Sequence, residues 1–181
     1  MPDGEASSRQ GRAEYQGVMM SLKALMIWRW EWLAIALTGS MIASALIMEH
    51  VMGLVPCPLC LMQRVWMIIV GTIAVAALAH GRSIGIYPLL GVVTAGIGGG
   101  FSVRHLYLQT LPPNEAPSCG PDLGYMFSNF PLADVLAAMT RGTGECAKVD
   151  SMIDVLIPLG ALAGFVLLVV ICTRGLLARG A

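Results

Sequence analysis

Two cysteines stand close together where a long apolar run begins. Cys57 and Cys60 are separated by Pro58 and Leu59, and the apolar run that follows contains Arg64. Cysteines at this spacing can form a disulfide or bind a metal ion, and the thiolate is the reactive form in both reactions. The pattern therefore indicates redox or metal chemistry at one end of an apolar segment.

The residues around the cysteine pair predict how it is presented. Pro58 suits the first turn of a helix, where its missing N–H would have no partner anyway. Cys57 is then the helix cap, and Cys60 lies in the first turn, where free amides and the helix dipole favour a thiolate. Arg64 follows Cys60 by four residues and lies on the same helical face, where its charge favours the same thiolate.

Arg64 needs an explanation of its own, because a charge inside a membrane span is costly. The cost is about 2.5 kcal/mol or more at the centre of the bilayer and smaller near its edge. One interpretation is an arginine whose charged end reaches the interface. We favour a functional interpretation, in which Arg64 holds the anionic form of an electron acceptor dissolved in the lipid.

The composition is typical of an integral membrane protein. The chain has 181 residues, of which 56% are hydrophobic and 12% are charged, and its formal net charge is zero. Ordinary soluble domains are about 25% charged. No basic stretch resembles a nucleic-acid-binding surface, so a nucleic-acid partner is not expected.

Four apolar runs predict an all-α membrane protein, a four-helix antiparallel bundle, because backbone groups in lipid must bond within their own segment. We expect a disordered tail over residues 1–20 and one membrane domain over 21–181. The predicted spans are 32–48, 61–79, 84–103 and 153–172, and the outer loops are 49–60 and 104–152. Gly96 and Gly100 have the spacing of a close helix contact, which is either internal or a dimer face. Within the long loop, 131–139 is amphipathic and suits a helix lying on the membrane surface.

The basic residues predict the orientation of the chain. They cluster before the first span, in the turn at Arg82 and after the last span, which favours both termini in the cytoplasm. Four of the five cysteines then face the outer compartment, and Cys172 is a small apolar residue near the inner side. Cysteines that face an oxidising compartment are disulfide candidates. Three pairings of the four are possible; proximity favours Cys57 with Cys60, which leaves Cys119 with Cys146.

The stretch Cys57-Pro-Leu-Cys-Leu-Met-Gln-Arg64, the four spans and the second cysteine pair resemble the DsbB family. This family comprises quinone-dependent oxidases of the bacterial inner membrane, which regenerate the periplasmic thiol oxidase DsbA. The resemblance covers the chain from about Trp28 to Cys172. It implies a monomeric thiol:quinone oxidoreductase whose partners are a DsbA-like protein and ubiquinone or menaquinone.

The resemblance also implies a role for individual residues. Cys57 and Cys60 correspond to the redox pair next to the quinone, and Cys119 and Cys146 to the loop pair that exchanges with DsbA. Electrons would pass between the pairs through a Cys57–Cys146 bond. The residues implied near the quinone are Arg64, His105, Gln63 and Gln109. Pro58 between the cysteines and Gln63, where some relatives have glutamate, depart from the family pattern.

Two other classes of function are compatible with parts of the sequence. One is a metal-binding membrane protein that uses Cys57, Cys60 and either His50 or His105. Structural zinc sites usually have two closely spaced ligand pairs, and Cys119 and Cys146 are too far apart in sequence for that, so no resident metal is expected. The other is a scaffold held by disulfides, which would give Arg64 no role.

Overall fold

A computed structural model describes residues 30–80, 85–112, 115–118, 123–149 and 152–180 of the chain. The predicted tail over 1–20 lies outside these residues. The described part contains helices and no strand, and four of its helices are long and apolar enough to cross a membrane. They are the helix Trp30–His50, α2 (Pro58–Ala79), α3 (Ile86–Gln109) and α6 (Met152–Gly180). The prediction of an all-α protein with four membrane helices is confirmed.

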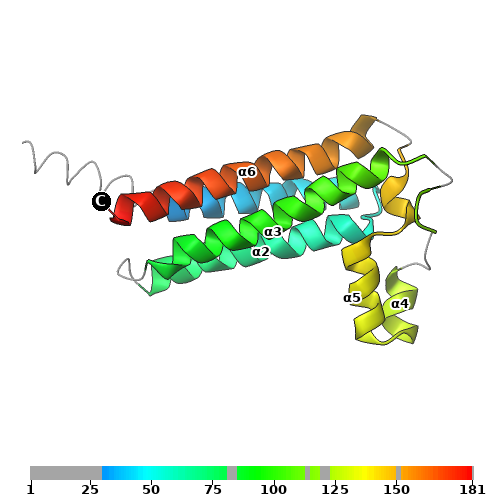
Figure 1. Cartoon of the computed structure of the whole chain (residues 1–181), viewed down its shortest axis with the longest axis horizontal. Coiled ribbons are helices and arrows are strands. Elements are labelled where there is room, and N and C mark those ends of the chain that lie inside the picture. The colour runs from blue at the N-terminus through cyan, green and yellow to red at the C-terminus, as the bar shows by residue number, and fades with distance from the viewer. Residues whose placement is uncertain (1–29, 81–84, 113–114, 119–122, 150–151, 181) are drawn as a thin grey trace, which may run out of the picture.

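The four long helices lie side by side and alternate in direction (Figure 1). The start of Trp30–His50 and the end of α6 lie at one end of the bundle, where Gly175 contacts the Trp30 ring. The start of α2, which contains the cysteine pair, lies at the other end. The fold therefore separates the cysteine pair from both ends of the described chain, and the cytoplasmic location of the termini stays a prediction.

The helices extend beyond the apolar runs from which they were predicted. α3 continues past residue 103 to Gln109, and α6 continues past residue 172 to Gly180. Hydropathy reports the segment that suits lipid, whereas the helical hydrogen bonds continue through polar residues at its ends. His105 and Gln109 therefore lie within the last turns of α3, rather than after a helix.

Glycines allow α3 and α6 to approach closely. A β-carbon on Gly98 would lie 2.2 Å from Cε1 of Phe165, and one on Gly91 would lie 2.7 Å from Sγ of Cys172. Among the described residues, no atom comes within 4 Å of the corresponding positions on Gly96 and Gly100. Of the two interpretations of the Gly96 and Gly100 spacing, the internal contact is not found among the described residues, because that pair lies on a different face of α3 from Gly91 and Gly98.

Three short helices stand between α3 and α6. They are α4 (Leu123–Asn129), α5 (Leu132–Arg141) and the 3₁₀ helix η1 (Gly144–Ala147). The amphipathic stretch 131–139 is helical, as predicted, and forms most of α5. Figure 1 shows α4 and α5 extending sideways from the cysteine end of the bundle. The helix α4 was not predicted, because its seven residues are too few to show a clear periodicity.

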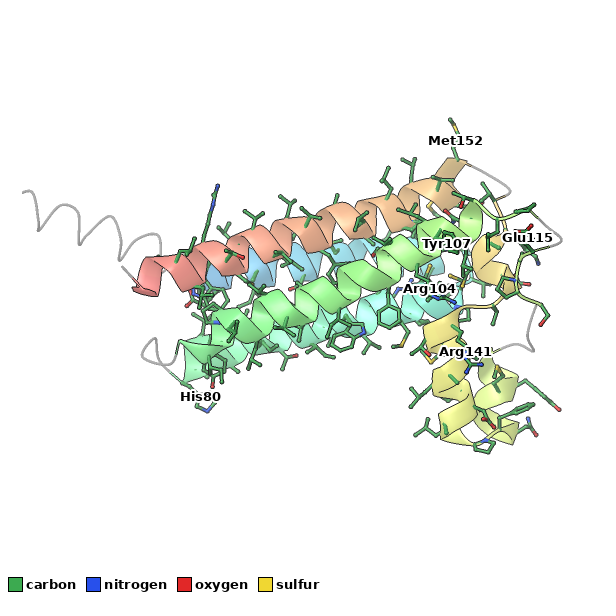
Figure 2. The ribbon with its side chains drawn as sticks, in the orientation of Figure 1. His80, Arg104, Tyr107, Glu115, Arg141 and Met152 are labelled. Atoms are coloured by element: carbon green, nitrogen blue, oxygen red, sulfur yellow. The ribbon has the colours of Figure 1, made fainter. Side chains whose placement is uncertain are left out.

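The turn after α5 places η1 over the start of α2. Arg104 of α3 donates a 2.8 Å hydrogen bond from Nε to the carbonyl of Arg141, and Figure 2 shows these two residues at the junction of α5 and the bundle. Gly142 follows with φ of 79° and packs against Leu59 and Leu108. A side chain would be strained at that φ and would clash with both leucines, so the turn requires glycine.

Candidate active site

The cysteine pair lies at the start of α2, as the sequence predicts. Cys57 is the N-cap residue, and Pro58 occupies the first turn. The Cys57 thiol donates to the sulfur of Cys60 over 3.1 Å, and both side chains are half-buried. A disulfide needs a sulfur separation of about 2.05 Å, so closing the bond requires a movement of about 1 Å. The site therefore allows interconversion of dithiol and disulfide without rearrangement of the helix.

His105 reaches the cysteine pair from α3. Its Nε2 lies 3.8 Å from Sγ of Cys57, and its Nδ1 lies 3.9 Å from Sγ of Cys60. The ring is 4% exposed. An imidazole facing both sulfurs can accept a proton from either thiol when it is neutral. The resemblance implied a position near the quinone for His105, and the structure brings it to the cysteines.

The third cysteine near this pair is Cys146, which belongs to η1. It is 1% exposed and belongs to an apolar cluster with Leu59 and Leu108, against which Cys57 packs. The interaction with Cys57, together with burial, raises the pKa of the Cys146 thiol well above its ordinary value. Cys146, Cys57 and Cys60 thus form a cluster of three cysteines, and each of them is a free thiol in this structure.

Cys119 lies outside the described residues, but the chain is described up to Ser118. The carbonyl of Ser118 accepts a 3.2 Å hydrogen bond from the N–H of Gly144. The residue directly before Cys119 is therefore held two residues from Cys146 in η1. The pairing of Cys119 with Cys146 stays a prediction, and this contact brings the two chain segments together at the same place.

Arg64 is paired with a residue that the sequence interpretation missed. Its guanidinium donates to the carboxylate of Glu49 and, over 3.1 Å, to the carbonyl of Ala45. Both acceptors belong to the helix Trp30–His50, and the side chains of Arg64 and Glu49 are 19% and 32% exposed. The sequence contains a sign of this pair. Glu49 lies at the end of one span and Arg64 in the second turn of the next, so both are at the same end of the bundle.

A cavity of about 440 Å³ lies next to the cysteine pair. Its apolar wall comes from the helix Trp30–His50, from α2 and from the first half of α6. Every described residue that the sequence predicts for the site lines this cavity, except Cys146. These lining residues are Cys57, Cys60, Gln63, Arg64, His105 and Gln109. A cavity of this size, with apolar walls and a few polar groups, has the features of a small-molecule site.

The side-chain amides of Gln63 and Gln109 each have one atom without a hydrogen-bond partner in the described part of the chain. Gln63 is 3% exposed, and within the described part of the chain its Nε2 has no hydrogen-bond partner. Gln109 donates from Nε2 to the carbonyl of Asp154 over 2.9 Å, whereas its Oε1 has no partner among the described residues. A buried polar atom without a partner costs about 1–3 kcal/mol. A ligand that hydrogen-bonds in this cavity would recover part of that cost.

Comparison with known proteins identifies the family. The profile of the family described as Disulfide bond formation protein DsbB matches residues 28–174. The chain belongs to the DsbB family. It is 50% identical over 115 residues to Disulfide bond formation protein B of Methylococcus capsulatus, which covers 62% of this chain and 70% of that protein. The protein of the same name from Stutzerimonas stutzeri is 38% identical over 151 residues, covering 80% and 93% of the two chains.

A third relative, Disulfide bond formation protein B of Saccharophagus degradans, is 44% identical over 137 residues, covering 72% of this chain and 81% of that protein. No solved structure matches the chain significantly. The family and the four apolar helices establish a multi-pass membrane protein of disulfide bond formation, with the disulfide oxidoreductase activity that the family name implies.

The histidines of the metal-binding alternative are separated by the fold. Sγ of Cys57, Sγ of Cys60 and a ring nitrogen of His105 all lie within 4.8 Å of one another. His50 is not in this group. Its side chain is exposed, and its Nδ1 lies 3.0 Å from the carbonyl of Leu46 within its own helix.

Proposed function

We propose that this protein is a thiol:quinone oxidoreductase that reoxidises a DsbA-like thioredoxin-fold oxidase at the periplasmic face of the bacterial inner membrane. The observation that carries the proposal is the cluster of three cysteines: Cys57 packs against the apolar cluster of Cys146, contacts Cys60 over 3.1 Å, and lines the cavity together with Cys60. The predicted orientation gives this end of the bundle the oxidising compartment that such chemistry needs.

The first stage is a pair of thiol–disulfide exchanges. A thiolate of the reduced partner attacks Cys119 of a Cys119–Cys146 disulfide, which forms a mixed disulfide and releases Cys146 as the leaving thiolate. Cys146 then attacks Cys57 of the Cys57–Cys60 disulfide. A Cys57–Cys146 bond forms, the Cys57–Cys60 bond breaks, and Cys60 leaves as a thiolate. The packing of Cys57 against the apolar cluster of Cys146 supports this step, because it keeps the attacking and attacked cysteines close together.

The second stage regenerates both pairs. The second thiolate of the partner attacks the mixed disulfide, which releases Cys119 and the oxidised partner. Cys119 attacks Cys146, restoring the Cys119–Cys146 disulfide and leaving Cys57 and Cys60 reduced. Their reoxidation to a disulfide gives up two electrons and two protons. The two electrons that left the partner are therefore on the Cys57–Cys60 pair, beside the cavity.

The residues around the cavity fit a quinone. The apolar wall of the cavity suits the quinone ring and the start of an isoprenoid tail. The amide nitrogen of Gln63, which has no partner among the described residues, can donate to a carbonyl oxygen of the quinone. Arg64 can stabilise negative charge, and Glu49 keeps its guanidinium on the cavity wall. When bound, a quinone accepts two electrons and two protons. These residues would bind ubiquinone or menaquinone through the same carbonyl groups.

His105 is the residue best placed to move protons at this site. Its two ring nitrogens face the two sulfurs, so a neutral ring can take the proton of Cys57 or of Cys60 as each becomes a thiolate. The ring and both sulfurs line the cavity, so the proton is collected where it is needed. His105 is thus proposed as the general base of the site.

The test mixes purified protein with ubiquinone or menaquinone and a reduced thioredoxin-fold oxidase, and follows the ultraviolet absorbance of the quinone. We expect quinol formation that is lost in Cys57→Ser and Cys60→Ser and retained in Cys172→Ser. Cys172 is a suitable control because it is buried between α6 and α3, remote from the cavity lining. If neither quinone is reduced in a cysteine-dependent manner, the proposed function is wrong.

A further inference from the structure

The reduced cysteine pair and His105 form a cluster with metal-ligand chemistry. We propose that the reduced protein binds one Zn²⁺, or a similar thiophilic divalent cation, through Sγ of Cys57, Sγ of Cys60 and one ring nitrogen of His105. The three ligand atoms lie within 4.8 Å of one another. The inference goes beyond the proposed function and depends neither on a quinone nor on a partner protein.

The distances are close to those of a tetrahedral zinc site. Bond lengths of about 2.3 Å to sulfur and 2.05 Å to nitrogen place two sulfurs about 3.8 Å apart, and a sulfur and a nitrogen about 3.6 Å apart. Nε2 of His105 lies 3.8 Å from Sγ of Cys57 and Nδ1 lies 3.9 Å from Sγ of Cys60. Because zinc binds a single ring nitrogen, a small rotation of the ring must bring that nitrogen close to both sulfurs, which already lie within 4.8 Å of it. The two sulfurs, 3.1 Å apart, must separate by about 0.7 Å, which a rotation of the half-buried Cys57 side chain can provide.

The charge of the cluster also favours a divalent cation. Two thiolates and a neutral imidazole carry two negative charges, so a bound Zn²⁺ leaves the site without net charge, which reduces the cost of desolvation. His105 is 4% exposed, so burial restricts the orientation of its ring, and a fixed ring is typical of metal-binding histidines. All three residues line the cavity, from which water can occupy a fourth position.

Binding of the cation depends on the redox state of the pair. Metals bind thiolates, and binding releases the two thiol protons; the sulfurs of a Cys57–Cys60 disulfide carry no such charge. The dithiol form therefore takes the metal, and the disulfide form does not. A bound cation occupies both sulfurs and prevents them from forming a disulfide, so it holds the protein in its reduced state.

The test uses the full chain carrying Cys119→Ser, Cys146→Ser and Cys172→Ser, so that the only remaining thiols are those of the pair. The reduced, desalted protein is titrated with Cd²⁺ without oxygen, and the thiolate-to-Cd²⁺ charge-transfer absorbance in the near ultraviolet is followed. Zn²⁺ affinity is measured by competition with a chromophoric chelator. We expect one equivalent to bind to the reduced protein and none to the same protein after oxidation to the disulfide.

Three substitutions test the ligand set in this background. We expect His105→Ala and His105→Gln to weaken Zn²⁺ binding at least tenfold, because each leaves two ligands. His50→Ala is the matched control and should bind as tightly as its parent, since His50 is outside the cluster. Circular dichroism checks that each variant is folded, and His105→Gln retains a polar side chain of similar size. Unchanged affinity in both His105 variants, or equal binding by the oxidised protein, would overturn the proposal.

Discussion

The close contact between Gly98 and Phe165 predicts that Gly98→Ala destabilises the bundle. The added β-carbon would lie 2.2 Å from Cε1 and 2.4 Å from Cζ of Phe165. Carbon atoms are optimally about 3.5–4.0 Å apart, so the two helices must separate or the ring must move by more than about 1 Å. Phe165 is 1% exposed and belongs to the main apolar core, so the ring has little room to move.

The size of the effect follows from two opposing terms. Overpacking a filled core costs about 1–3 kcal/mol. The change from glycine to alanine within a helix returns up to about 1 kcal/mol. After subtraction of that return, we expect the free energy of unfolding to fall by up to about 2 kcal/mol. His105 lies two helical turns further along α3, about 10 Å away, so separation of α3 from α6 also displaces a residue of the active site.

The assay is unfolding of the purified protein in mixed micelles with increasing sodium dodecyl sulfate, followed by circular dichroism. Gly96→Ala and Gly100→Ala are matched controls in the same helix, because their β-carbons would meet no described atom within 4 Å. We expect both controls to be as stable as the parent or up to about 1 kcal/mol more stable. Equal stability of Gly98→Ala and Gly96→Ala would refute the contact between α3 and α6 as described.

Three further predictions concern the cluster of three cysteines and the ion pair beside it. Cys60→Ser combined with Cys119→Ser, isolated under oxidising conditions, should contain a Cys57–Cys146 disulfide, detected by mass spectrometry of an unreduced digest; finding Cys57 only as a free thiol would contradict the proximity of the two residues. Because the pKa of Cys146 is raised in the folded protein, its thiol should be stabilising below the ordinary pKa of about 8.5, and the reduced protein should lose stability as pH rises above that value. The measurement is unfolding of the reduced protein from pH 7 to 10, with Cys146→Ser, which should show a smaller loss, as control. Glu49→Ala should raise the KM for quinone roughly fivefold with little change in kcat, because the Arg64 guanidinium loses the carboxylate that orients it. Glu49→Gln should behave like the parent because it still accepts from Arg64. Identical KM values for all three proteins would argue against an orienting role.

Much of the architecture could be predicted from local sequence features. The four apolar runs predict the four helices, because hydropathy responds to the same burial in lipid that the helices achieve. Pro58 places the start of α2 correctly and makes Cys57 its cap, because the geometry of proline favours that position regardless of tertiary contacts. These features depend on a few neighbouring residues, so the sequence alone contains their cause.

The contacts between distant segments could not be predicted in the same way. The interpretation of Arg64 considered the thiolate and the electron acceptor, and it overlooked Glu49, which lies on another helix. The glycine spacing at Gly96 and Gly100 suggested a contact that occurs instead at Gly98, because the rotation of α3 is decided by its packing on α6. The position of Cys146 depends on the Gly142 turn and on Arg104, both of which act through tertiary contacts.

The hydrogen bond between Ser118 and Gly144 makes the segment between them a loop that is closed at its base. Such a loop can be lengthened or replaced at little entropic cost, because the cost of closing a loop grows only slowly with its length. Cys146 lies outside the closed part, and within the loop its position depends on the last residues, Arg141 and Gly142, which contact α3 and α2. A protein built in this way can change the middle of the loop, and with it the surface that meets a protein substrate, while the end of the loop keeps Cys146 in place.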